Sequence, residues 1–399
     1  MTTFGCAMWD RRDWFQQLFG FKEADYDETK KMLKVENDAD KPGMLVLKSL
    51  ANGSLGFRWS SAMPLLAREA GTFFRIGRFE TPSLKELRSK VLEDEPKALV
   101  QRRLKVTNEI GDVALKHALP ENRLATFQVA SQFNCLEFVG PSVVPEDGIT
   151  GYVMDRTQGP ACSIACGPAT AFRNFFVPMP SGQEGQRKGM QINNLEDFSA
   201  ELQRLCQPEP SGPEGRPEGR LGAAPSFRVT SGYTQASHRE LQKLNRSLSR
   251  LSNEDLEALR DTLRIGLHEE VQVTATAWGA KRLATEEQLV TQVFGSACSV
   301  AYNRDSSSED WQPLATLILE ASYEATLLAA LKQAKKHAGQ EGSKKVFLTC
   351  LGGGVFGNSM EWIVQAMDRA FQRLQDADLD VRIVTYAGSP GPELRCLER

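Results

Sequence analysis

The stretch that decides the fold is VFLTCLGGGVFGN, residues 346–358. Its first six residues form a mostly apolar run with the length of a strand buried on both faces of a parallel sheet. Four glycines within six residues follow. After them, apolar residues recur at the spacing that places one stripe on a helix: Ile363, Ala366, Met367, Ala370 and Phe371. The stretch therefore predicts a strand, a glycine loop and a helix, with Asn358 as the helix N-cap and Glu361 reaching back to it.

The glycine loop predicts a site for an anion. Glycine has no Cβ atom, so a ligand can approach the backbone closely, and free N–H groups at a helix start attract phosphate. A turn that only joins a strand to a helix needs one or two glycines. Four glycines therefore favour a loop that faces a ligand.

The loop also has the spacing Gly352-x-Gly354-x-x-Gly357 of dinucleotide-binding folds. In those folds the fingerprint opens the domain, several further βα units follow, and an acid ends the next strand. Here only one helix and one strand, residues 381–386, follow the loop, and no acid stands after that strand. A Walker loop is excluded as well, because no Gly-Lys-Ser/Thr follows the glycines.

Length, charge and composition narrow the class of protein. The chain of 399 residues exceeds one average domain, and its net charge of −3 gives no general attraction to nucleic acid. No apolar run of transmembrane length and no signal-peptide core are evident. The eight cysteines and four histidines lack the spacing of metal ligands. We therefore expect an intracellular protein, cytoplasmic or nuclear, without a membrane partner, a metal or a cofactor.

The order of elements predicts an α/β fold. Residues 1–100 are expected to form an N-terminal α+β module of unknown role. Residues 101–399 form a second unit, interrupted by a flexible Pro/Gly-rich insertion at residues 207–225. In this unit strands, such as residues 124–131 and 271–276, alternate with long helices, one of which is expected to start at Pro313. This order predicts a layered sheet flanked by helices, with ligands at the carboxyl ends of the strands.

Three segments resemble the macrodomain superfamily. Residues 346–358 look like its late phosphate loop, and most like the Gly-x-Gly-x-Phe-Gly loop of the microbial poly(ADP-ribose) glycohydrolase branch. FQVASQFN, residues 127–134, is similar to the early strand whose terminal polar residues meet the distal ribose. EIGDV, residues 109–113, is similar to the Gly-Asp pair that holds the adenine amino group. The resemblance covers about residues 105–388 and implies a macrodomain-like mixed sheet flanked by helices, with an N-terminal α+β extension.

The resemblance implies a pocket for ADP-ribose or an ADP-ribosylated macromolecule. The backbone N–H groups of residues 353–357 would cradle the diphosphate, and the Phe356 ring would flank the sugar. The ligand-binding residues that it implies are Asp112, Gln132, Asn134, Gln158, Gly352, Gly353, Gly354, Val355, Phe356, Gly357 and Asn358. From its position alone, Asn134 is equally a turn residue.

The resemblance weakens at the residues that would carry catalysis. Glycohydrolases of this branch have an early glycine triplet and then Gln-Glu-Glu, whose carboxylate protonates the leaving group. This chain has FVGPSVVP, residues 138–145, and Gln158-Gly159-Pro160 at those places. A glycosidic cleavage still needs a carboxyl group or a positioned water. The nearest acids are Glu137, Glu146, Asp147 and Asp155.

Asp155, beside Gln158, is the first candidate for catalysis. An aspartate at this place also suits a purely structural role, in which it bonds the backbone N–H groups of a loop. Three hypotheses therefore stay open. The chain binds ADP-ribose or an ADP-ribosylated partner without turnover, it is a divergent ADP-ribosyl glycohydrolase that uses Asp155, or it is a non-catalytic interaction scaffold.

Overall fold

The structure is a computed structural model, and it describes residues 11–39, 41–51, 72–92, 103–206, 227–283 and 285–399. The predicted insertion at residues 207–225 lies outside the described residues. The strands are β1 (Leu33–Asn37), β2 (Leu45–Ser49), β3 (Thr72–Glu80), β4 (Lys105–Ile110), β5 (Thr126–Ala130), β6 (Arg228–Thr230), β7 (Tyr233–Gln235), β8 (Gly266–Gln272), β9 (Ala275–Thr276), β10 (Lys281–Arg282), β11 (Leu289–Gly295), β12 (Lys345–Leu348) and β13 (Asp380–Thr385). The α-helices are α1 (Trp14–Phe19), α2 (Tyr26–Lys31), α3 (Leu84–Leu92), α4 (Val113–Ala118), α5 (Gln158–Ala165), α6 (Gly167–Phe175), α7 (Glu196–Leu205), α8 (His238–Leu248), α9 (Asn253–Thr262), α10 (Ser308–Lys336), α11 (Met360–Arg373) and α12 (Pro392–Arg395).

Nine of the described strands form one mixed sheet in the order β1-β2-β3-β8-β11-β5-β12-β13-β4. Strands β11, β5, β12, β13 and β4 are parallel to one another, and the pairs from β1 to β11 are antiparallel. The predicted α/β class with a mixed sheet is thus confirmed. The parallel half places the carboxyl ends of its strands at one edge, where α/β folds bind ligands.

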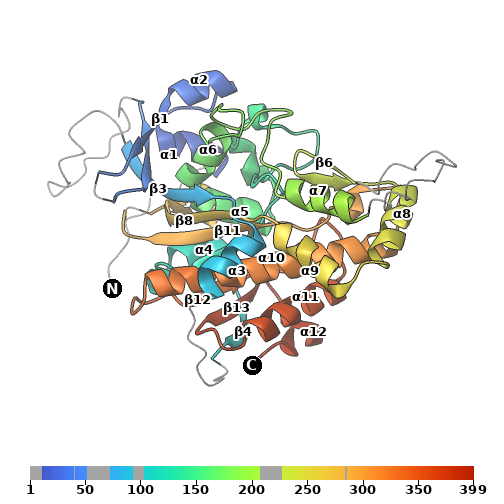
Figure 1. Ribbon diagram of the computed structural model, residues 1–399. Helices are drawn as coiled ribbons and strands as arrows, with labels where there is room; N and C mark the ends of the chain where they lie inside the picture. The colour runs from blue at the N-terminus through green and yellow to red at the C-terminus, as the bar shows by residue number, and fades with distance from the viewer. Residues whose placement is uncertain (1–10, 40, 52–71, 93–102, 207–226, 284) are drawn as a thin grey trace.

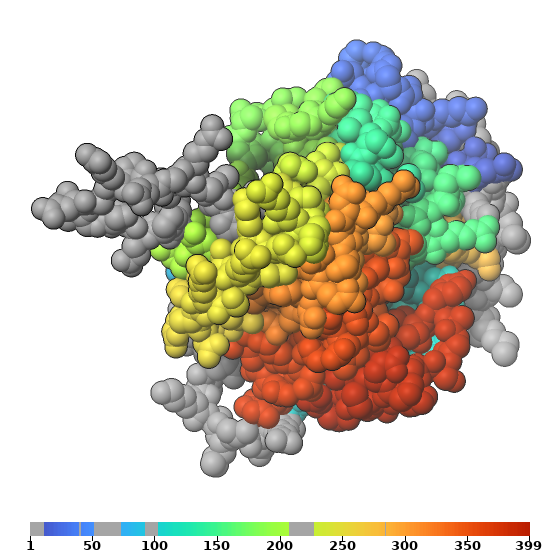
Figure 2. Space-filling view, turned by 90° about the vertical axis from the view of Figure 1, so that its right-hand side faces the viewer, coloured from blue at the N-terminus to red at the C-terminus, as the bar shows by residue number. Residues whose placement is uncertain are grey.

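Helices cover both faces of this sheet (Figure 1). Alternate residues of β5 contact helices on opposite faces of the sheet. Phe127 and Val129 pack with α4 and α5 on one face. Gln128, between them, points to the other face and donates to Thr326 Oγ1 of α10 at 3.0 Å. Helix α10 packs in turn on α3, α8, α9 and α11. In the view of Figure 2, the yellow segment with α8 and α9 lies against the orange segment that follows β11.

The N-terminal segment continues the main sheet. Strand β3 pairs with β8 at Arg78–Glu80, and β2 and β1 extend the sheet beyond it. The sheet thus crosses the boundary predicted at residue 100, because the edge of β8 offers backbone groups that need partners. The described part of residues 1–100 contains helices and strands, as expected. Its role as a separate module stays a prediction.

Helix α10 differs from two expectations. It starts at Ser308, capped by Ser307, so Pro313 lies inside the helix and not at its start. No apolar run of transmembrane length was expected from the sequence, yet α10 is long and apolar enough to cross a membrane, with a mean hydropathy of 1.4 over 18 residues. Of that window, 89% is buried inside the protein, as in the core helix of a soluble protein. Its apolar residues join the largest described core cluster.

Buried His117 makes the core sensitive to acid. Its Nδ1–H donates to the Val113 carbonyl oxygen at 2.7 Å, and its Nε2 lies 3.2 Å from the amide nitrogen of Gln292, which donates to it. Burial lowers the pKa of His117 to about 4. Because the folded-state pKa lies below the unfolded value of 6.5, the stabilising effect is present above pH 6.5 and is lost as pH falls toward 4.

We therefore expect the free energy of unfolding to fall by roughly 3 kcal/mol between pH 6.5 and 4 through His117 alone. Urea unfolding at several pH values measures this slope. A His117→Gln variant cannot titrate at this position. Its free energy of unfolding should therefore fall by about 3 kcal/mol less between pH 6.5 and 4 than that of the wild type. Equal slopes in the two proteins would contradict the assignment.

Candidate functional site

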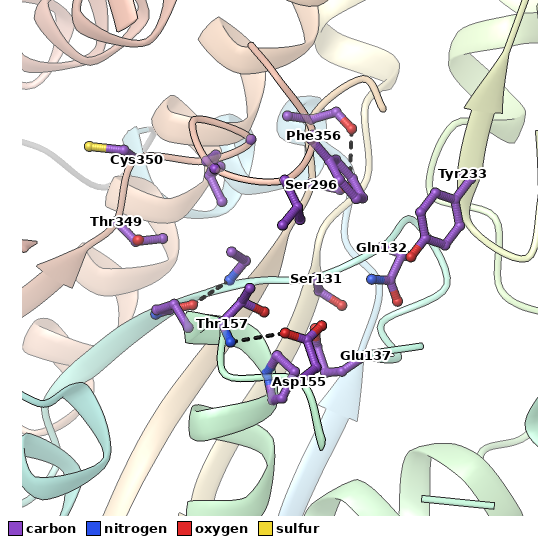
Figure 3. Close-up of a pocket in the computed structure, with 18 of the residues that line it drawn as sticks. Ser131, Gln132, Glu137, Asp155, Thr157, Tyr233, Ser296, Thr349, Cys350 and Phe356 are labelled. Atoms are coloured by element: carbon purple, nitrogen blue, oxygen red, sulfur yellow. Dashed lines mark hydrogen bonds between the residues drawn. The ribbon is translucent and has the colours of Figure 1, made fainter. Parts of the chain in front are cut away.

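A pocket lies at the carboxyl ends of three neighbouring parallel strands, β5, β11 and β12. Its walls come from the segments that follow these strands and from the start of α5. The cavity has a volume of about 240 Å³. This is below the roughly 300–1,000 Å³ typical of pockets that enclose a drug-sized ligand. Figure 3 shows the loop with Cys350 and Phe356 on one side and Glu137, Asp155 and Thr157 on the other.

The glycine loop follows β12, as the sequence predicts, and α10 holds its start. The Tyr323 hydroxyl donates to the Thr349 carbonyl oxygen at 2.8 Å and accepts from the Leu351 N–H at 2.9 Å. The helix after the loop is α11. Its N-cap is Ser359 and not Asn358, because the Ser359 hydroxyl accepts from the Glu361 N–H. The Asn358 amide instead donates to the Cys298 carbonyl oxygen at 2.7 Å and so anchors the end of the loop.

The glycines of this loop serve different purposes. Gly352 and Gly357 have φ angles of +71° and +74°, a conformation that favours glycine. Gly353 packs against Ile363 of α11. At Gly354, by contrast, a Cβ atom would meet nothing within 4 Å, and its φ is not in the left-handed region. Only Gly354 therefore has no structural reason to be glycine, and it lines the pocket.

Three consecutive backbone N–H groups in this loop have no hydrogen-bond acceptor in the described part of the chain. Gly353 donates to the Cys350 carbonyl oxygen and Gly357 to that of Gly354. Among the residues that the structure describes, no acceptor bonds to the N–H groups of residues 354, 355 and 356. All three residues line the pocket, and Gly354 and Val355 are exposed. Successive unpaired N–H groups of this kind form an anion-binding concavity.

An aromatic cluster forms the wall beside the loop. The ring of Phe356 lies 5.4 Å from that of Tyr233 and 5.7 Å from that of Tyr302, measured between centroids. Tyr233 comes from the hairpin of β6 and β7, and its hydroxyl donates to the Phe138 carbonyl oxygen at 2.5 Å. Neither tyrosine was predicted from the sequence. The Ser-Gly pair at residues 231–232 was the available signal, because it marks a hairpin turn.

The polar residues after β5 mainly build their own loop. Asn134 accepts from the Leu136 N–H at 3.0 Å and donates to Gln191 at 2.7 Å, and it does not line the pocket. Gln132 does line the pocket. Its Oε1 accepts from the Phe138 N–H at 2.9 Å, while its Nε2 has no partner among the described residues. Gln132 is therefore the amide that a ligand can reach.

Gln158 and Asp112 hold secondary structure in place. Gln158 accepts from the Ala130 N–H and donates to the Gln128 carbonyl oxygen, each at 2.8 Å, so its amide extends the ladder of β5. It still lines the pocket. Asp112 is the N-cap of α4 and accepts from the N–H groups of the first turn. Asp112, Gly353, Gly357 and Asn358 do not line this pocket, and their ligand roles stay predictions.

Two acids line the pocket on the side opposite the loop. Asp155 is half-buried, and its Oδ1 accepts from the Thr157 N–H at 3.0 Å, the loop-holding contact that the sequence left open. Glu137 is 1% exposed. Burial raises the pKa of the Glu137 carboxyl well above its usual value, and the Arg173 guanidinium partly opposes this. The sequence named Glu137 only as a nearby acid, because burial cannot be read from one residue in a loop.

The N-terminal segment supports the loop that carries Asp155. Glu23 accepts from the N–H groups of Ile149 at 2.8 Å and Thr150 at 2.6 Å. The Trp14 indole donates to the Thr150 carbonyl oxygen at 3.1 Å. Residues far from the pocket in sequence therefore fix the segment that leads into it. Among the described residues, no group of three or more metal-ligating side chains comes together.

The solved structures that the chain resembles include bacterial poly(ADP-ribose) glycohydrolases. The enzyme from Thermomonospora curvata is 14% identical and matches 80% of this chain and 84% of its own, with a TM-score of 0.37. The enzyme from Deinococcus radiodurans in complex with ADP-ribose is 11% identical and matches 80% of this chain and 91% of its own, also with a TM-score of 0.37. No model of a known protein family matches the chain, and no curated protein does.

Proposed function

We propose that this pocket binds ADP-ribose, free or attached to a macromolecule. The observation that carries the proposal is the run of three unpaired N–H groups at residues 354–356, on the rim of a cavity. A diphosphate is the part of ADP-ribose that such a run of N–H groups attracts. The sequence of the loop, which resembles the late phosphate loop of macrodomains, supports the same ligand.

The other walls of the pocket suit a sugar beside the diphosphate. Phe356 and Tyr233 offer ring faces against which the carbon atoms of a ribose can pack. The free Nε2 of Gln132 can donate to a ribose hydroxyl, and Asp155 can accept from one. In this proposal the adenosine extends beyond the cavity of about 240 Å³. Contact of the adenine with Asp112 remains part of this proposal.

Calorimetry with free ADP-ribose tests the proposal. We expect a saturable heat with one site per chain. Pyrophosphate should compete, because it carries the anionic group that the loop would bind, and ribose 5-phosphate should bind much more weakly. Absence of heat with ADP-ribose would contradict the proposal and favour the hypothesis of a non-catalytic interaction scaffold.

A second candidate function is cleavage of a glycosidic bond of ADP-ribose. It is favoured by the presence of two carboxyl groups in one pocket, those of Asp155 and Glu137. Glycosidic cleavage uses carboxyl groups as acid, base or nucleophile. Asp155 is the first candidate from the sequence. Its contact with Thr157 occupies Oδ1 and leaves Oδ2 without a partner among the described residues.

A further inference from the structure

Glu137 places a buried carboxyl group in the wall of the pocket. It lines the pocket and is 1% exposed. Its backbone N–H is held by the Tyr152 hydroxyl at 3.0 Å, which fixes the position of the residue. Among the described residues no donor reaches its Oε1. Burying a carboxyl oxygen without a partner costs free energy, so the position of this side chain needs an explanation other than the stability of the fold.

Gly159 makes room for this carboxyl group. A Cβ atom at residue 159 would overlap with Oε2 of Glu137 and with the carbonyl oxygen of Ala130. A side chain at 159 and the Glu137 carboxyl group therefore exclude each other. This chain has a glycine there, and the carboxyl group of Glu137 fills the adjoining space.

The surroundings of Glu137 favour its protonated form. Burial is the largest cause of its raised pKa, and the charge of Asp155 raises it further. The Arg173 guanidinium and the hydroxyls of Ser131 and Ser163 act in the opposite direction. A general acid must hold its proton at the working pH, and enzymes achieve this for glutamate by burial.

We propose that Glu137 is the general acid for cleavage of an O-glycosidic bond at the anomeric carbon of a bound ADP-ribosyl group. The proposal rests on the ADP-ribose binding proposed above. As the bond between the anomeric carbon and the leaving oxygen breaks, its electron pair stays on that oxygen, which takes the proton of Glu137. A water molecule adds to the carbon and gives its surplus proton to the Glu137 carboxylate. The products are ADP-ribose and an alcohol, and the acid is restored.

Two synthetic glycosides of ADP-ribose with different leaving groups test this role. One carries a serine peptide, whose alkoxide leaves only with a proton. The other carries 4-nitrophenol, which leaves readily without one. We expect Glu137→Gln to slow release from the serine glycoside by roughly 100- to 10,000-fold, the usual contribution of a general acid. Release from the nitrophenyl glycoside should slow by less than about tenfold.

The pH profile and a second variant complete the test. For the wild type, release from the serine glycoside should decline as pH rises through the raised pKa of Glu137. Asp155→Asn should retain the ratio between the two glycosides. An equal loss on both glycosides in Glu137→Gln, full activity of this variant on the serine glycoside, or transfer of the leaving-group dependence to Asp155→Asn would each overturn the proposal.

Calorimetry with ADP-ribose on the same proteins separates two kinds of failure. Wild type and Glu137→Gln should bind ADP-ribose with similar affinity, which also shows that the variant is folded. If both bind and the wild type cleaves neither glycoside, the role of Glu137 is wrong and the proposed binding stands. If the wild type does not bind ADP-ribose, the proposed function fails as well.

Discussion

Replacing Gly354 with glutamate is expected to weaken ADP-ribose binding by roughly 100- to 1,000-fold. The residue lines the pocket, and a Cβ atom there meets nothing within 4 Å, so the fold has room for the side chain. A carboxylate at this place would lie near the proposed diphosphate. Like charges about 4 Å apart repel by about 4 kcal/mol at an effective dielectric constant of about 20, and every 1.4 kcal/mol or so changes the affinity tenfold.

Two variants at the same position serve as controls. Gly354→Gln has nearly the shape of the glutamate without its charge, so it should bind ADP-ribose far more tightly than Gly354→Glu. Gly354→Ala adds only a methyl group and no charge, so it should lose much less affinity than Gly354→Glu. Calorimetry measures all three. If the glutamine and glutamate variants bind equally, charge at residue 354 does not matter and the diphosphate lies elsewhere.

The glycine loop shows which parts of the site could be predicted from the sequence. Its residues predicted a strand, a loop and a helix, and β12 and α11 confirm this order. They could not predict which glycines the backbone needs. Gly352 and Gly357 satisfy φ angles, Gly353 fits against Ile363, and only Gly354 is left for a ligand. Counting glycines cannot separate these requirements, because each depends on atoms distant in sequence.

For a related reason, the sequence could not predict how the N-terminal strands pair. Strand β3 pairs with β8, so that Arg78 lies opposite Glu269. The apolar pattern of a strand shows which of its residues face the core. It does not show which sheet edge the strand pairs with, because many edges could accept it. The alternation of strands and helices after residue 104 was more informative, since parallel strands joined by helices form one sheet with few possible arrangements.

The two acids of the pocket also differ in how far the sequence could predict their positions. Asp155 was selected because of its neighbour Gln158, and it does line the pocket. Glu137 precedes an apolar residue in a loop, and nothing in its local sequence indicates that it is buried. Its depth follows from contacts with Tyr152 and from the glycine at 159. Chemistry that depends on burial therefore needs the fold before it can be assigned.

Arg173 links the stability of the fold to this acid. It is 0% exposed and lies in α6. Its guanidinium donates to the Cys135 carbonyl oxygen at 3.0 Å and to the hydroxyls of Ser163 at 3.3 Å and Thr170 at 3.1 Å. It also stacks over the ring of Phe294, 3.8 Å from its centroid. Among the described residues it forms no ion pair with a carboxylate, so these contacts and a fourth hydrogen bond, which it donates to His268 Nδ1 at 3.2 Å, replace its hydration.

We expect Arg173→Met to lower the free energy of unfolding by about 3–5 kcal/mol. Methionine has a similar length but leaves the Cys135 carbonyl oxygen and both hydroxyls buried without a donor, each at a cost of about 1–3 kcal/mol; removal of the desolvated charge offsets part of this sum. Urea unfolding measures the change. Arg250→Met, at an exposed position on the surface, should stay within about 0.5 kcal/mol of the wild type.

The same variant should also act on Glu137. The positive charge of Arg173 lowers the pKa of that carboxyl group, so its removal should raise the pKa further. If Glu137 is the acid, the decline in release from the serine glycoside at high pH should shift to higher pH in Arg173→Met, measured at a temperature where the variant is folded. A merely structural Arg173 would reduce the amount of active protein without moving the profile. An unchanged profile would therefore separate the stability of the fold from the tuning of the acid.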